Sequence, residues 1–202
     1  MLSINPVELL ELHLPRMDMS TIEIRQATMA DRDAIVRVFR DSFIPITQDC
    51  FPGIDISPFT IEAFTPLWEE LMSDPNNGIF VAVDDAHIVG VVALAPTRNP
   101  RVLELEKLFI DPSHQGRKIG PALVEQAINY AQEMGCSSLV LSTWEASKPS
   151  QKLYESMGFV RTGERSQSQY NGIPAENQTT LRYMLALQPA RDPTPPPVHR
   201  FY

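Results

Sequence analysis

The sequence predicts a mixed α/β fold built on one β-sheet, and three observations support this. The chain has 202 residues, 43% of them hydrophobic, which is enough for one substantial core and too little for two. Alternating or β-rich apolar runs predict seven strands, and apolar residues at helical spacing predict four helices. Strands alternate with helices only in the second half of the chain, so the pattern differs from a doubly wound Rossmann sheet.

The first predicted elements are a strand and two helices. Thr21–Gln26 alternates apolar and polar residues, as a half-buried strand does. Thr28 caps a helix that runs to about Phe43, and a second helix spans Thr60–Met72. Residues 44–58 hold three prolines and a glycine and therefore predict a loop.

A run of strands follows, and then helices and strands in alternation. Ile79–Val83 and Ile88–Ala95 are joined by a short turn and predict a hairpin, and Val102–Ile110 predicts a third long strand. The remaining predicted elements are helix Pro121–Glu133, strand Leu139–Ser142, helix Lys148–Met157, strand Phe159–Gly163 and strand Thr180–Leu187. This order implies one domain over 21–187, with an N-terminal extension over 1–20 and a proline-rich tail over 188–202.

Composition and charge exclude several classes of function. The net charge of −8 disfavours binding of nucleic acid, and no apolar run approaches the roughly 18 residues of a membrane helix. The N-terminus lacks the pattern of a signal or transit peptide, so we expect a cytoplasmic protein, with the nucleus as a second compartment. Two cysteines without a CxxC pair and four scattered histidines predict no metal site.

The segment His114–Gly120 lies between a predicted strand and a predicted helix. In such a turn, successive backbone N–H groups and the open first turn of the helix form a site for an anion. Gly116 and Gly120 allow the backbone to approach a ligand closely, and Arg117 and Lys118 add charge that suits a pyrophosphate. By itself, such a turn is equally compatible with a structural role.

This turn and a second segment resemble the GNAT superfamily of N-acetyltransferases. Gln115, Lys118 and Gly120 occupy the three defined positions of the family motif Gln/Arg-x-x-Gly-x-Gly/Ala, and Lys118 departs from the motif because it replaces the first glycine. Downstream, Leu139–Phe159 resembles the family's next strand, helix and Tyr-x-x-x-Gly-Phe element, in which the tyrosine is Tyr154. The resemblance covers nearly the whole predicted domain. It implies a twisted, mostly antiparallel sheet of about seven strands flanked by about four helices.

The resemblance also implies that the protein binds acetyl-CoA as a cosubstrate. The residues that it assigns to cofactor binding lie at the end of the long strand, in the glycine-basic turn and on the later helix. They are Leu108, Phe109, Ile110, Gln115, Gly116, Arg117, Lys118, Ile119, Gly120, Ser147, Ser150 and Tyr154.

Forming an amide from an amine and a thioester requires a neutral amine. A lysine-like amine has a pKa near 10.4, so its neutralisation at pH 7 costs about 4–5 kcal/mol. The resemblance implies a carboxylate base on the long strand, acting directly or through water. Glu104 and Glu106 are separated by one residue and are expected to share a face of that strand. Glu104 is preferred as the base because it lies farther from the cofactor turn, and Glu106 stays a candidate for the same role.

Two further groups follow from the resemblance. A backbone N–H from around residues 108–110 would polarise the thioester carbonyl, and Tyr154 would protonate the departing thiolate. Neither cysteine has a histidine nearby in the sequence, which favours direct attack in a ternary complex over a covalent cysteine intermediate.

The acceptor is expected to be a small amine or polyamine, or a protein amine, and the protein a monomer or homodimer. The predicted loop and its border carry Asp49, Phe51, Asp55 and Phe59, a mixture that suits cationic amines. Two alternatives stay open. One is a catalytically weak acyl-CoA-binding sensor of the same fold, and the other is an interaction protein whose Pro-x-x-Pro tail recruits partners.

Overall fold

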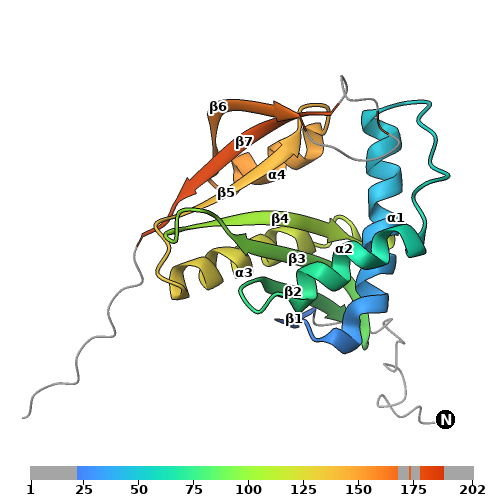
Figure 1. Ribbon diagram of the computed structural model, residues 1–202, viewed down its shortest axis with the longest axis horizontal. Coiled ribbons are helices and arrows are strands. Elements are labelled where there is room, and N and C mark those ends of the chain that lie inside the picture. Colours follow the sequence, from blue (N-terminus) through green and yellow to red (C-terminus); the bar gives the residue numbers. More distant parts are fainter. Residues whose placement is uncertain (1–21, 168–172, 174–177, 189–202) are drawn as a thin grey trace, which may run out of the picture.

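A computed structural model describes residues 22–167, 173 and 178–188, which form one seven-stranded sheet and four α-helices (Figure 1). The strands are β1 (Glu23–Gln26), β2 (Gly78–Asp84), β3 (His87–Pro96), β4 (Val102–Ile110), β5 (Ser138–Trp144), β6 (Val160–Gln167) and β7 (Thr179–Ala186). The helices are α1 (Arg32–Cys50), α2 (Ile61–Ser73), α3 (Ile119–Glu133) and α4 (Lys148–Ser156). Short 3-10 helices lie at Met29–Asp31 and Pro112–His114.

The strand order is β1-β2-β3-β4-β5-β7-β6, and every neighbouring pair is antiparallel except β4 with β5. The predicted mixed, mostly antiparallel fold is therefore confirmed. The predicted N-terminal extension and nearly all of the predicted tail lie outside the described residues.

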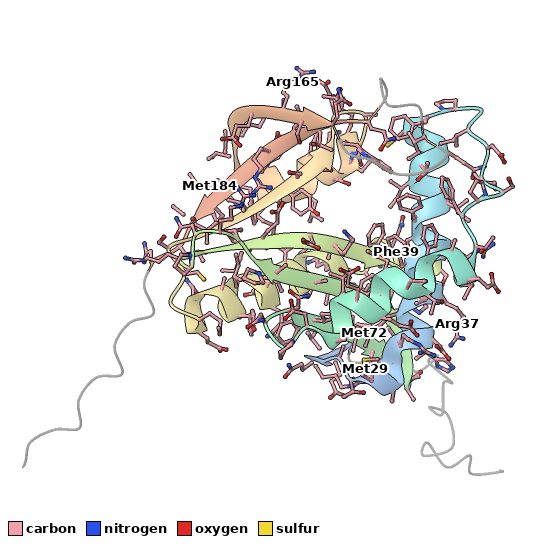
Figure 2. All side chains as sticks on the ribbon, viewed as in Figure 1. Met29, Arg37, Phe39, Met72, Arg165 and Met184 are labelled. Carbon is pink, nitrogen blue, oxygen red and sulfur yellow. The ribbon has the colours of Figure 1, made fainter. Side chains whose placement is uncertain are left out.

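The sheet separates two hydrophobic cores, although the length of the chain predicts a single substantial one. Helices α1 and α2 cover one face, and α3 and α4 lie against the other (Figure 1). Successive residues of a strand point to opposite faces, so Val91 of β3 belongs to the α1–α2 core and Val92 to the α3 core. Phe39 of α1, labelled in Figure 2, lies in the α1–α2 core with its ring centroid 4.6 Å from that of Phe109 on β4. Side chains on both faces thus fix the position of β4.

Helix α1 is longer than the sequence predicts. The prolines of residues 44–58 predict a loop, but the helix continues through Pro45 to Cys50. A proline removes only one helical N–H, and the next turn is stabilised because the Thr47 hydroxyl donates to the Phe43 carbonyl at 2.6 Å and both side chains are buried. The loop prediction is therefore wrong for this stretch, which forms one wall of the site described below.

Two aromatic residues that were expected to suit a cationic acceptor are buried in the core. The ring centroid of Phe51 lies 5.0 Å from that of Trp144, and the centroid of Phe59 lies 5.2 Å from that of Phe43. Only 7% of Phe51 and 4% of Phe59 are exposed. Their rings hold the segment after α1 against the sheet, so they are not available to bind a cation.

Strands β4 and β5 diverge after a short stretch of pairing. Their parallel pairing joins Val102–Leu105 to Ser138–Leu141, whereas β4 continues to Ile110 and β5 to Trp144. Figure 1 shows the widening space between β4 and the β5–β7 pair. Backbone groups on the two facing edges lose their strand partners there, which leaves them available to a ligand.

A β-bulge interrupts β4 at Glu106. Ala93 of β3 lies opposite Lys107, and the next residue, Leu94, lies opposite Leu105, so Glu106 is the extra residue. A bulge redirects side chains and increases the local twist of a strand. The side chains of β4 therefore stop alternating between the two faces of the sheet at this point.

Candidate active site

Two adjoining cavities lie where β4 and β5 diverge. The smaller has a volume of about 300 Å³ and the larger a volume of about 700 Å³. The smaller cavity is bounded by α1, β4, β5 and β7, and the larger by α1, the end of β4, the turn before α3, and α4. The residues that line both cavities are Ile46, Leu108, Phe109, Ser147, Ser150 and Tyr154.

The turn between β4 and α3 lines the larger cavity. The residues predicted to bind the cofactor that lie in this part of its wall are Gln115, Gly116, Lys118, Ile119 and Gly120. Helix α3 begins at Ile119, earlier than predicted, with Lys118 as its N-cap. Gly116 and Lys118 both have positive φ, 79° and 63°, which turns the chain sharply before the helix. The open first turn of α3 therefore presents N–H donors at this cavity.

The Arg117 side chain does not line the larger cavity, unlike those of its neighbours in the turn. Its guanidinium donates to the Asp84 carboxylate of β2 at 2.6 Å, and Nε2 of His114 lies 3.5 Å from the same oxygen. These contacts tie the turn to the β2–β3 hairpin. The basic side chains of the turn that line the larger cavity are thus Lys118 and His114, and His114 carries no motif that would have singled it out in the sequence.

The first turn of α4 forms another part of the wall. Ser147 is the N-cap, and its hydroxyl shares a 2.7 Å hydrogen bond with the Ser150 hydroxyl instead of capping a backbone N–H. Ser147 also contacts the thiol of Cys50, which lines the larger cavity. Burial raises the pKa of the Cys50 thiol, and the hydrogen bond with Ser147 only partly offsets this. The sulfur therefore stays protonated at neutral pH, which disfavours a thiolate nucleophile.

Tyr154 of α4 lies at the junction of the two cavities. Gly158 follows the helix with a φ of 89°, a left-handed conformation that favours glycine. The chain then reverses, the Phe159 N–H donates to the Tyr154 carbonyl at 3.0 Å, and the two rings pack with centroids 5.8 Å apart. The Tyr-x-x-x-Gly-Phe spacing thus encodes this turn. Tyr154 is buried, and burial raises the pKa of its phenol well above the ordinary value, so the phenol stays protonated.

Glu104 and Glu106 both line the smaller cavity, but their partners differ. The Arg182 guanidinium of β7 donates to both oxygens of the Glu104 carboxylate, and to the Ser142 hydroxyl at 3.1 Å. The Glu106 carboxylate lies 3.9 Å from the Lys107 ammonium, and no group of the described residues donates a hydrogen bond to it. Arg182 reaches this site because β7 pairs with β5, a contact that no local sequence pattern reveals.

Leu108, Phe109 and Ile110 lie at the divergent end of β4. On one edge they pair with β3, whereas the pairing with β5 has already ended. The Ile110 carbonyl accepts a hydrogen bond from the Ser42 hydroxyl at 2.7 Å, which fixes the end of the strand against α1. The edge that faces β5 borders both cavities, at the place where a carbonyl-polarising N–H was expected.

The described residues form no helix that is long and apolar enough to span a bilayer. In the same part of the chain, no three His, Cys, Asp or Glu side chains converge to hold a metal ion.

Comparison with known proteins establishes the family. The model of the acetyltransferase (GNAT) family matches residues 40–159, more than half of the chain. The chain therefore belongs to this family, and the resemblance seen in the sequence is confirmed. An uncharacterized N-acetyltransferase of Schizosaccharomyces pombe is 37% identical over 90 residues, which cover 44% of this chain and 55% of that protein. The N-acetylaspartate synthetase of Xenopus tropicalis is 34% identical over 92 residues, which cover 46% of this chain and 34% of that protein.

The fold is shared with solved structures. The PaiA N-acetyltransferase of Thermoplasma acidophilum, solved in complex with coenzyme A, is 17% identical and matches with a TM-score of 0.59. The match covers 82% of this chain and 99% of that chain. The chain spans about half or less of the length of the two curated relatives described above.

Proposed function

We propose that this protein is an N-acetyltransferase that moves the acetyl group of acetyl-CoA to an amine by direct attack in a ternary complex. The observation that carries the proposal is the meeting of two cavities at Tyr154, one beside an N–H-rich turn and the other beside two carboxylates. A donor and an acceptor bound in these cavities would have their reacting groups side by side, which lowers the entropic cost of the reaction. Membership of the GNAT family supports the same class of reaction.

The larger cavity fits the chemistry of CoA. Its volume of about 700 Å³ lies within the range of small-molecule sites. Gly116, Lys118 and the first turn of α3 would hold the pyrophosphate through backbone N–H groups and one ammonium. The open edge of Leu108–Ile110 would offer backbone groups to the amide-bearing arm of the cofactor and to the thioester carbonyl.

Lys118 combines charge with an unfavourable backbone conformation. Its φ of 63° costs a residue with a β-carbon about 1–2 kcal/mol, a penalty that glycine avoids. We expect Lys118→Gly to raise the free energy of unfolding by up to about 1 kcal/mol, since part of the gain is lost to the entropy of the unfolded chain. The same change removes an ammonium from the cavity, so CoA affinity should fall by about 3–10-fold.

Thermal unfolding and calorimetric titration with CoA measure these two effects. Lys118→Ala is the matched control, because it removes the same charge and keeps the β-carbon. Equal stability of the two variants would contradict the role of backbone strain, and unchanged CoA affinity in both would contradict the role of the ammonium.

The proposed base is Glu106 rather than Glu104. The Glu104 carboxylate is held by two hydrogen bonds from Arg182, and protonating it would sacrifice that ion pair. The Glu106 carboxylate faces the smaller cavity with one cation, Lys107, at 3.9 Å. It is therefore the group that we propose takes a proton from the acceptor ammonium, directly or through water.

The proposed proton donor is Tyr154. The neutral amine attacks the thioester carbonyl, a C–N bond forms, and the C–S bond breaks with its electron pair on sulfur. The Tyr154 phenol gives its proton to that sulfur and is reprotonated from the acetylated nitrogen, directly or through water. The proton first taken by Glu106 passes to solvent, so one proton is released for each acetyl group transferred.

A thiol-release assay on the full chain tests the proposal. Acetyl-CoA is supplied with separate sets of acceptors (amino acids, polyamines and peptides with a free N-terminus), and the acetylated product is identified by mass spectrometry. We expect thiol release that depends on one of these sets. CoA binding without turnover of any amine would favour the sensor alternative over the enzyme, and absence of CoA binding would contradict both.

A further inference from the structure

The Lys107 side chain lines the smaller cavity, and among the described residues its ammonium has one charged partner, at the outer limit of an ion pair. Only 13% of its side chain is exposed. Among the described residues, no group accepts a hydrogen bond from it, and its carboxylate neighbour, Glu106, is 3.9 Å away. A cation that is mostly withdrawn from bulk water gains strongly from a closer anionic partner.

The bulge in β4 explains why two adjacent charged residues line one cavity. In a regular strand, neighbouring side chains point to opposite faces of the sheet. Glu106 is the extra residue of the bulge, and both it and Lys107 line the smaller cavity, on the side of the sheet that α1 covers. The irregularity therefore sets a carboxylate and an ammonium side by side in one small space.

The remaining charge in this cavity is already paired. The Glu104 carboxylate forms an ion pair with Arg182, so this pair adds no net charge. The other described residues that line the cavity are uncharged, and they include the aromatic residues Phe43, Phe109 and Trp144. What remains for a ligand is one negative group on Glu106 and one positive group on Lys107, in a wall that mixes aromatic and hydroxyl side chains.

We propose that the acceptor is a small zwitterion, such as a free α-amino acid, whose carboxylate binds Lys107 while its amine faces Glu106. An α-amino acid carries both charges on one carbon, which matches two protein charges that are 3.9 Å apart. The volume of about 300 Å³ is at the lower end for small-molecule sites and suits a single amino acid. A polyamine fits less well, because its second ammonium would face Lys107. The inference rests on the proposed acetyl transfer and specifies its acceptor.

Matched acceptors test this assignment in the full chain. The rates of acetylation are compared for leucine, leucinamide and 3-methylbutylamine, which share a side chain and differ in the group beside the amine. We expect kcat/KM for leucine to exceed that for the other two by about 10–100-fold, the range of one charge-assisted hydrogen bond.

Substitution of Lys107 then assigns the preference to one side chain. Lys107→Gln should bring the ratio between leucine and 3-methylbutylamine close to one, and Lys107→Arg should retain most of it. Lys152→Gln, at an exposed position on α4, is the matched control and should keep the wild-type ratio. A wild-type ratio near one, or an unchanged ratio in Lys107→Gln, would overturn the inference.

A binding measurement separates this inference from the proposed activity. Ligand-observed NMR with leucine and 3-methylbutylamine is recorded in the presence of CoA, for the wild type and for Lys107→Gln with its folding checked by circular dichroism. If no amine is turned over, the proposed activity fails. Leucine binding that requires Lys107 would still support the zwitterion site, and equal binding of leucine and the amine would refute it.

Discussion

Replacing Tyr154 by phenylalanine is expected to lower kcat by about 10²–10³-fold while leaving CoA affinity nearly unchanged. The change removes only the phenolic hydroxyl. The ring keeps its volume, so its packing against Phe159, with centroids 5.8 Å apart, should persist and the first turn of α4 should stay in place. The departing thiolate loses its proton donor, and the chemical step slows.

The pH profile adds an independent check on the role of Tyr154. Burial raises the pKa of this phenol above its ordinary value near 10, so the group is protonated throughout the usual assay range. Loss of the hydroxyl should therefore lower the plateau of kcat without moving any ionisation below about pH 9.

Stopped-flow thiol release and calorimetric titration with CoA measure the two quantities. Tyr130→Phe is the matched control, because this tyrosine lies on α3 and packs against Phe80, outside both cavities, and its kcat should equal that of the wild type. Equal losses of kcat and CoA affinity in Tyr154→Phe would instead assign the phenol a role in anchoring the cofactor.

The second large effect is expected for Glu106→Gln, which should lower kcat by about 10²–10⁴-fold. The amide keeps the size of the side chain but accepts no proton, so the variant depends on acceptor that is already neutral. Below the pKa of the amine, its residual kcat should rise about tenfold for each pH unit, more steeply than that of the wild type. Steady-state kinetics from pH 6 to 9.5 would reveal this difference.

Glu104→Gln is the matched control for Glu106→Gln. It removes the ion pair with Arg182, and because both partners are partly exposed, the expected cost is up to about 1 kcal/mol of stability. Its loss of kcat should be smaller, with the pH dependence of the wild type. If Glu104→Gln showed the steeper pH dependence and Glu106→Gln did not, the base would be Glu104 and not Glu106.

The strands and helices could be predicted from local patterns, because each depends on periodicity within its own segment. The Tyr154–Phe159 element and the glycine-basic turn were also visible, since both are local turns with specific backbone needs. The end of α1 could not be predicted in this way. A proline such as Pro45 usually ends a helix, unless buried contacts in the next turn compensate for the hydrogen bond that it removes.

The features that distinguish Glu106 from Glu104, and Arg117 from the other basic residues of the turn, arise from contacts between distant segments. Register with β3 creates the bulge at Glu106, and pairing of β7 with β5 brings Arg182 to Glu104. Asp84 on β2 draws Arg117 away from the larger cavity. None of these contacts has a signal in the segment that it affects. The preference for Glu104 in the sequence therefore rested only on its distance from the cofactor turn, and no local pattern distinguished the basic residues of that turn.

The short pairing of β4 with β5 has a mechanical consequence. The pairing of β4 with β5 consists of four residue pairs and connects two parts of the sheet, which we call leaves: β1 to β4 form one, and β5, β7 and β6 form the other. The seam is this short β4–β5 pairing, and it can act as a hinge between the leaves. Tyr154 of α4 shares one hydrophobic cluster with residues of both leaves, including Leu105 on β4 and Leu141 on β5. A small rotation about the seam would therefore shift the proton donor relative to β4, within the range that this shared cluster allows. We therefore expect tightening around bound substrates to take the form of a change in the angle between the leaves.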